Sequence, residues 1–124
     1  MAILCAVPSL DTSVCDMETR KFNAEAANLS DDILIWTIST DFPMAQKRWC
    51  GAAGIDKVKV VSDVLEAEFG VKYGLLVKER RYLRRAVFIV DKNGKLTYVA
   101  YMPSNSVEPN YAEVIEAAKA VLKK

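Results

Sequence analysis

The sequence predicts a single α/β domain spanning residues 1–124, with a mixed β-sheet and helices on both faces of that sheet. Three observations favour this fold class. Short apolar runs alternate with segments of helical periodicity along most of the chain. Two later apolar runs flank an Asn-Gly turn, which indicates an antiparallel hairpin. The apolar content of 52% is enough for one compact core, whereas the length is too short for two.

The first predicted strand and helix meet close to a cysteine. Residues 3–7 form a continuous apolar run, typical of a strand buried on both faces of a sheet, and Pro8 ends it because proline lacks a backbone N–H. From Ser13 the apolar side chains follow a helical stripe that reaches about residue 26. Cys15 is therefore expected in the first turn of a helix that begins shortly after the strand.

A second strand and helix follow. Residues 33–38 are apolar and predict the strand. Pro43 can begin the next helix, because the backbone N–H that proline lacks would have no partner in a first turn. This helix is expected to run to about Gly51, and Cys50 lies close to its end.

The remaining predicted elements, in chain order, are a strand at 58–61, a helix at 63–69 that ends at Gly70, an irregular connection at 73–82, strands at 86–90 and 96–101 around a turn at 91–94, and a helix at 110–122. The whole order is typical of the thioredoxin-like architecture. In open α/β sheets the chemistry lies beyond the carboxyl ends of the strands, which is where Cys15 is expected.

The charge balance excludes several classes of partner. Lys and Arg number 17 against 16 Asp and Glu, so the net charge of +1 creates no strong field that would attract nucleic acid or an anionic membrane. No apolar run approaches the ~20 residues that span a bilayer. The first residues also lack the pattern of a signal peptide. We therefore expect a cytoplasmic protein whose partners are small, uncharged or locally recognised.

The cysteine and histidine counts restrict the chemistry further. Three cysteines in a chain rich in apolar residues do not indicate a disulfide-stapled scaffold, and catalytic or redox thiols explain them better. The absence of histidine removes Ser-His and Cys-His catalysis and the usual zinc and haem ligands. Gly51 and Gly54 lack the context of a phosphate loop, so nucleotide binding is not expected. No metal or organic cofactor is predicted.

Cys15 is the candidate nucleophile, because the unpaired N–H groups of a helix N-terminus stabilise a nearby thiolate. Taken alone, a cysteine in a first turn is more often a small buried residue. Two neighbours favour catalysis: the Thr12 hydroxyl can point at the thiolate or at a bound oxygen, and Pro8 can shield the pocket from water.

The other thiols and two arginines have ordinary explanations that compete with a functional one. Cys5 lies within the first apolar run and is interpreted as structural. Cys50 can be a packed surface cysteine, and it matters for chemistry only if it reaches Cys15. Arg84 and Arg85 can be a solvated strand end, although one of them could lean over a thiolate at the edge of the sheet.

Three separate motifs, in the same order along the chain, resemble those of the thiol peroxidases, the atypical two-cysteine branch of the peroxiredoxins. Residues 7–15 resemble the peroxidatic loop, in which proline is followed by three residues, Thr or Ser, two residues and Cys. Residues 41–51 resemble the helix of the resolving cysteine, and residues 85–87 the strand that carries the active-site arginine. The resemblance covers nearly the full chain. Family members usually begin with about forty further residues, which include a β-hairpin.

The resemblance implies a role for five residues. Cys15 would be the peroxidatic thiolate, Thr12 and Arg85 would hold and polarise the peroxide, Pro8 would shield the pocket, and Cys50 would be the resolving thiol. It also implies thioredoxin or a similar dithiol as the reductant, and a homodimer as an option. Ser13 stands where proline is common in the family, which is a minor departure.

Two functions remain open from the sequence. The first is a peroxidase that reduces hydrogen peroxide and organic hydroperoxides through a Cys15 sulfenic acid and a disulfide with Cys50. The second is a thioredoxin-like redox-sensing or binding module without turnover. A plain dithiol oxidoreductase is disfavoured, because Cys15 is not part of a Cys-x-x-Cys pair.

Overall fold

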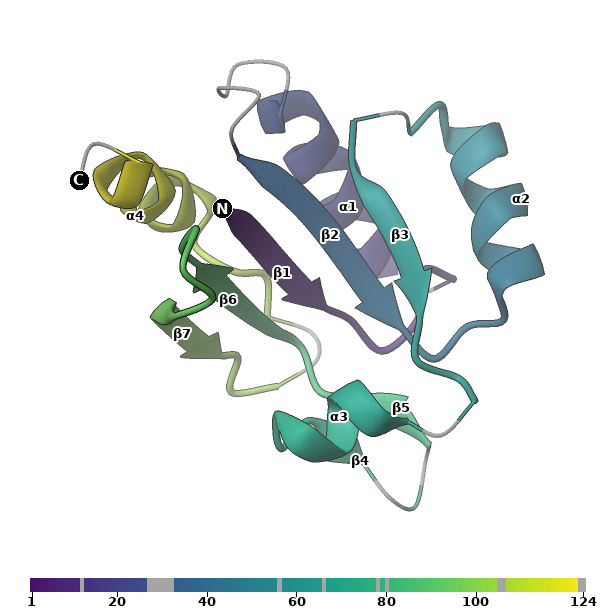
Figure 1. Cartoon of the computed structure of the whole chain (residues 1–124). Coiled ribbons are helices and arrows are strands. Elements are labelled where there is room, and N and C mark those ends of the chain that lie inside the picture. Colours follow the sequence, from purple (N-terminus) through teal and green to yellow (C-terminus); the bar gives the residue numbers. More distant parts are fainter. Residues whose placement is uncertain are drawn as a thin grey trace.

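Figure 1 shows a computed structural model of the chain, which describes residues 1–11, 13–26, 33–55, 57–65, 67–77, 79, 81–104 and 107–122. The elements are β1 (Ala2–Ala6), α1 (Ser13–Ala26), β2 (Leu34–Ser39), α2 (Pro43–Ala53), β3 (Lys59–Ser62), α3 (Glu68–Lys72), β4 (Leu76–Val77), β5 (Tyr82–Leu83), β6 (Ala86–Val90), β7 (Leu96–Tyr101) and α4 (Tyr111–Leu122). Most predicted elements lie within one or two residues of these bounds.

The main sheet has five strands in the order β3-β2-β1-β6-β7. β1, β2 and β3 run parallel, whereas β6 is antiparallel to β1 and β7 is antiparallel to β6. The predicted mixed, thioredoxin-like sheet is thereby confirmed. β1 is the central strand, so the loop that leaves its carboxyl end emerges between β2 and β6, at the end of the sheet where the parallel strands finish (Figure 1).

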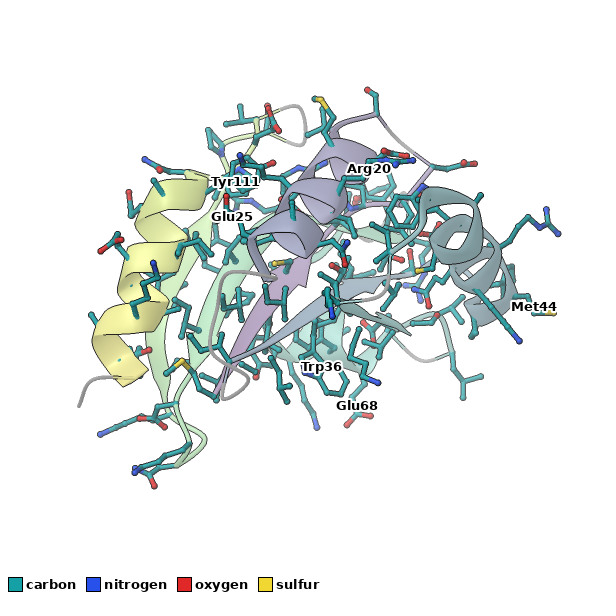
Figure 2. All side chains as sticks on the ribbon, turned by 90° about the horizontal axis from the view of Figure 1, so that it is seen from above. Arg20, Glu25, Trp36, Met44, Glu68 and Tyr111 are labelled. Atoms are coloured by element: carbon teal, nitrogen blue, oxygen red, sulfur yellow. The ribbon has the colours of Figure 1, made fainter. Side chains whose placement is uncertain are left out.

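Helices cover both faces of the sheet, as predicted. On one face α1 and α4 pack together through Phe22 and Tyr111, whose rings meet edge to face with centroids 5.3 Å apart. Trp36 of β2 lies on the other side of the sheet from Arg20 and Tyr111 (Figure 2). That second face is covered near the carboxyl ends of the strands by α3 and the β4–β5 pair. Its buried residues are Ala6, Ile38, Leu75, Leu83, Ala86 and Phe88.

The prediction for α3 was wrong in its bounds. The helix begins at Glu68 instead of residue 63, and Gly70 lies inside it instead of ending it. The Asp63 carboxylate accepts the backbone N–H groups of Phe69 and Gly70 at 3.0 and 2.7 Å. Asp63 thus lies outside the helix and provides acceptors for N–H groups of its first turn, which have no partner within the helix. A Cβ atom at Gly70 would lie 2.5 Å from Cδ2 of Leu83. Glycine is present there because the helix packs closely on β5.

The predicted irregular connection at 73–82 was also wrong in part. β4 and β5 form a two-residue antiparallel pair within it, with Leu76 opposite Leu83 and Val77 opposite Tyr82. Strands this short carry no readable alternation. They are fixed by tertiary packing, since Leu75 and Leu83 are buried against the sheet.

The hairpin of β6 and β7 is confirmed. Gly94 has a φ of 80°, which other residues rarely adopt, and its N–H donates to the Asp91 carbonyl at 3.0 Å. The Asp91 carboxylate accepts the N–H groups of Asn93 and Lys95, both at 2.9 Å.

Among the helices of the described residues, none is both long enough and apolar enough to cross a membrane.

Candidate active site

Cys15 lies in the first turn of α1, beyond the carboxyl end of β1, and is fully buried. The backbone that leads to it is fixed to the neighbouring strand, because the N–H of Val7 donates to the carbonyl of Ile38 at 3.0 Å. Within the helix, the Thr19 hydroxyl donates to the Cys15 carbonyl at 2.9 Å. The sulfur is therefore held on a rigid frame in the positive potential of a helix N-terminus.

Arg85, directly before β6, contacts the sulfur of Cys15. Its Nη2 donates to the Cys15 Sγ at 2.9 Å, and its side chain is only 1% exposed. Arg84 points away, is exposed, and donates from Nε and Nη2 to the Met102 carbonyl at 3.2 and 3.0 Å. Neighbouring residues in extended backbone face opposite sides, which is why only one of the two arginines meets the thiol.

Glu18 is a buried member of this cluster that sequence reasoning missed. It is fully buried, and among the described residues neither of its carboxylate oxygens has a hydrogen-bond partner. Its Oε1 lies 3.4 Å from Nη1 of Arg85, longer than the ~2.8 Å of a charge-assisted hydrogen bond. Burial raises the pKa of Glu18 to about 7, although the Arg85 charge opposes this effect. The available signal was its spacing of three residues from Cys15, which places both on one helix face.

Cys5 lies in β1, behind the cluster formed by Cys15, Arg85 and Glu18. It is fully buried, and desolvation raises its pKa well above the usual range. The charge of Glu18 raises that pKa further, while Arg85 acts in the opposite direction. Cys5 is therefore a protonated thiol in the core, in agreement with its interpretation as structural.

Pro8 and Thr12 flank the path from β1 to α1. Pro8 is buried. Thr12 lies outside the described residues, so the structure does not place its hydroxyl relative to Cys15.

Asp41 connects the loop before Cys15 to the start of α2. Its carboxylate accepts three hydrogen bonds: from the Ser9 hydroxyl at 2.6 Å, and from the Leu10 N–H and the Ser39 hydroxyl at 2.8 Å each. Sequence reasoning placed Asp41 within a motif but assigned it no role. A signal was available, because an Asp in the short connection between a strand and a proline-initiated helix is well placed to bind backbone N–H groups.

Cys50 lies in the last turns of α2 and is half-buried. Burial raises the pKa of its thiol. Cys15 and Cys50 are both free thiols in this structure. The two helices are nevertheless in contact, because the indole Nε1 of Trp49 donates to the Asp16 carboxylate at 2.9 Å.

A cavity of about 310 Å³ lies between the loop before Cys15 and α2. Its lining residues are Leu10, Asp11, Asp41, Ala45, Arg48, Trp49 and Ala52. Within the described ranges, the cysteine, aspartate and glutamate side chains do not gather in groups of three or more that could hold a metal ion.

This combination of fold and buried thiol defines a class of protein. The model of the Redoxin family matches residues 2–115, and the chain belongs to that family. Its similar curated relatives carry a narrower name than the family model does. A thiol peroxidase of Bacillus subtilis is 50% identical over 123 residues, which cover 99% of this chain and 73% of the relative. A thiol peroxidase of Oceanobacillus iheyensis is 53% identical over 113 residues, 91% of this chain and 68% of the relative.

A solved structure supports the same assignment. The crystal structure of a peroxiredoxin-like protein from Aquifex aeolicus superposes with a TM-score of 0.90 at 41% identity, and the match covers 97% of this chain and 71% of that one. The predicted resemblance to thiol peroxidases is confirmed by these relatives. The chain is shorter than they are.

Proposed function

We propose that this chain is a thiol-dependent peroxidase that reduces hydrogen peroxide and organic hydroperoxides at Cys15. The observation that carries the proposal is the hydrogen bond from Arg85 to the Cys15 sulfur at 2.9 Å, inside a buried site at a helix N-terminus. A guanidinium keeps its positive charge at neutral pH, and here one of its N–H groups donates directly to the sulfur that would attack the peroxide. The similarity to thiol peroxidases supports the same reaction.

The first step is a two-electron oxidation of sulfur. The Cys15 thiolate attacks one peroxide oxygen, an S–O bond forms and the O–O bond breaks. The departing oxygen takes the electron pair and a proton and leaves as water or an alcohol, while Cys15 becomes a sulfenic acid. Arg85 can stabilise the negative charge that grows on the leaving oxygen, an effect that is large in a site without water.

The second step involves Cys50. Its thiol attacks the Cys15 sulfenic sulfur, an S–S bond forms, and the hydroxyl leaves as water after taking up the thiol proton. A dithiol protein such as thioredoxin would then reduce this disulfide and restore both thiols. In this proposal Pro8 shields the pocket and Thr12 holds the peroxide. The enzyme can act as a homodimer, which sedimentation of the reduced protein would test.

Steady-state peroxide consumption tests the proposal. The chain is supplied with thioredoxin, thioredoxin reductase and NADPH, and NADPH oxidation is followed with hydrogen peroxide and with cumene hydroperoxide. We expect turnover that Cys15→Ser abolishes and Cys5→Ser largely retains, with circular dichroism showing that both variants fold. A disulfide that forms without turnover would instead favour the redox-sensing module.

A further inference from the structure

The residues next to the two thiols are bonded to each other. Asp16 follows Cys15 in α1, and its Oδ2 accepts a hydrogen bond from Nε1 of Trp49, the residue before Cys50 in α2. Arg20 adds to this contact: its Nε donates to the other oxygen of Asp16, and its guanidinium lies 5.8 Å from the centroid of the Trp49 ring. The contact between α1 and α2 is therefore a small polar cluster, placed one residue away from each thiol.

The same arrangement places Cys50 on a different row of α2 from Trp49. Successive side chains of a helix point about 100° apart. Ala45, Trp49 and Ala52 form the row of α2 that lines the cavity beside the loop before Cys15. Cys50 belongs to a neighbouring row with Gln46, whose side-chain amide donates to the Val61 carbonyl of β3 at 2.8 Å. With Trp49 directed at α1 and Gln46 directed at β3, we infer from the helix periodicity that Cys50 is turned towards β3.

If Cys50 faces β3, a disulfide with Cys15 requires this part of α2 to rearrange. The two Cα atoms must come within about 7 Å, with both Cβ atoms directed at each other. Rotating or unwinding the last turns of α2 would turn Cys50 towards Cys15. The same movement would carry Trp49 away from Asp16 and break their hydrogen bond. Gly51, directly after Cys50, weakens the helix at this point, since glycine in a helix interior is less favourable than alanine. The other end of α2 is anchored by the buried side chain of Gln46.

We propose that the hydrogen bond from Trp49 to Asp16 is a latch that holds Cys50 away from Cys15 until it opens, so that Trp49 controls the rate of disulfide formation. This inference rests on the proposed function, because it concerns the second step of that reaction. Trp49 is a positioning residue, because it acts on Cys50 through α2. A closed latch has a chemical consequence: while Cys50 is held away, a second peroxide can oxidise the sulfenic acid to sulfinic acid, with the peroxide reduced to water.

The substitution Trp49→Phe tests the latch, because it removes the N–H donor and keeps an aromatic ring. Single-turnover reactions with hydrogen peroxide are quenched with a thiol-alkylating reagent and analysed by mass spectrometry. Because this bond is only part-buried, losing it should make disulfide formation about three to ten times faster. The rate constant of Cys15 oxidation should remain within twofold, and less sulfinic acid should form in excess peroxide.

Matched variants make the test specific. Trp36→Phe is the same chemical change on the other face of the sheet and should leave both rates unchanged. Asp16→Ala should accelerate disulfide formation like Trp49→Phe, and the double variant should be no faster than either, because both changes remove one bond. Asp16→Asn keeps an acceptor oxygen and should largely restore the original rate.

Two results would overturn the inference. Disulfide formation in Trp49→Phe at the original rate or slower, with sulfenic acid formed normally, would show that the bond does not control the step. Acceleration in Trp36→Phe as well would show a general loosening of the fold. The proposed function itself is tested separately in Cys50→Ser, where the sulfenic acid cannot proceed to the disulfide. Failure of Cys15 to form sulfenic acid in that variant would contradict the proposed function.

Discussion

Replacing Glu18 with glutamine should change how stability depends on pH. Burial raises the pKa of this carboxyl from 4.5 to about 7 in the folded chain, against the pull of Arg85. The folded chain therefore binds the proton more tightly than the unfolded chain does. The contribution of Glu18 to the free energy of unfolding should be largest below about pH 4.5 and should be lost as the pH rises through 7. Glutamine stays neutral throughout and resembles the protonated acid.

The two pKa values give the size of the effect. They differ by about 2.5, and each pH unit corresponds to 1.36 kcal/mol, so the native state loses roughly 3 kcal/mol between pH 4 and pH 8. The advantage of Glu18→Gln over the parent should grow by that amount across the same range. Urea unfolding of both reduced proteins at intervals from pH 4 to pH 8.5 measures this difference directly.

A glutamate on the surface provides the control. The pKa of Glu68 is lowered by its hydrogen bond and charge pairing with Lys72, and the group is exposed. Glu68→Gln should therefore show only a weak pH dependence of opposite sign, in which a small advantage of the parent disappears as the pH falls. Parallel stability curves for Glu18→Gln and the parent from pH 4 to pH 8.5 would refute the burial argument.

Three further changes should have separable effects. Arg85→Ala should slow the reaction of Cys15 with peroxide roughly 100-fold in stopped-flow measurements, as the loss of a donor to a developing negative charge commonly does, whereas Arg84→Ala should stay within about threefold; equal effects would contradict the geometry. Asp41→Asn should lower the free energy of unfolding by about 1–3 kcal/mol, because its carboxylate accepts three hydrogen bonds; urea unfolding would show no change if these bonds are unimportant. Gly70→Ala should cost about 1–3 kcal/mol through the clash with Leu83, and a stabilised variant would disprove that packing.

The order of strands and helices could be predicted because each main strand contains a short apolar run and each long helix has an apolar stripe. The β6–β7 hairpin was predictable for a local reason, since an Asn-Gly turn carries its own backbone preference. α3 was not, because its bounds depend on the side chain of Asp63 and on the close approach of Gly70 to Leu83. Contacts of that kind exist only after folding.

The site divides in the same way. A thiol in a first helical turn is visible in the sequence, and so is an arginine at the start of a strand. That the structure brings Cys15 and Arg85 to 2.9 Å follows from the pairing of β1 with β6, 80 residues apart in the chain. Glu18 resembles an ordinary acidic residue near a helix start, and only its spacing of three residues from Cys15 indicates the face on which it is buried.

The central claim is that the peroxide reacts with Cys15, the thiol bonded to Arg85. The most direct measurement treats Cys50→Ser with one equivalent of hydrogen peroxide, traps sulfenic acid with dimedone and locates the adduct by peptide mass spectrometry. The account predicts a single adduct, on Cys15, that disappears in Cys15→Ser/Cys50→Ser. An adduct on Cys5, or none while peroxide is still consumed, would contradict it.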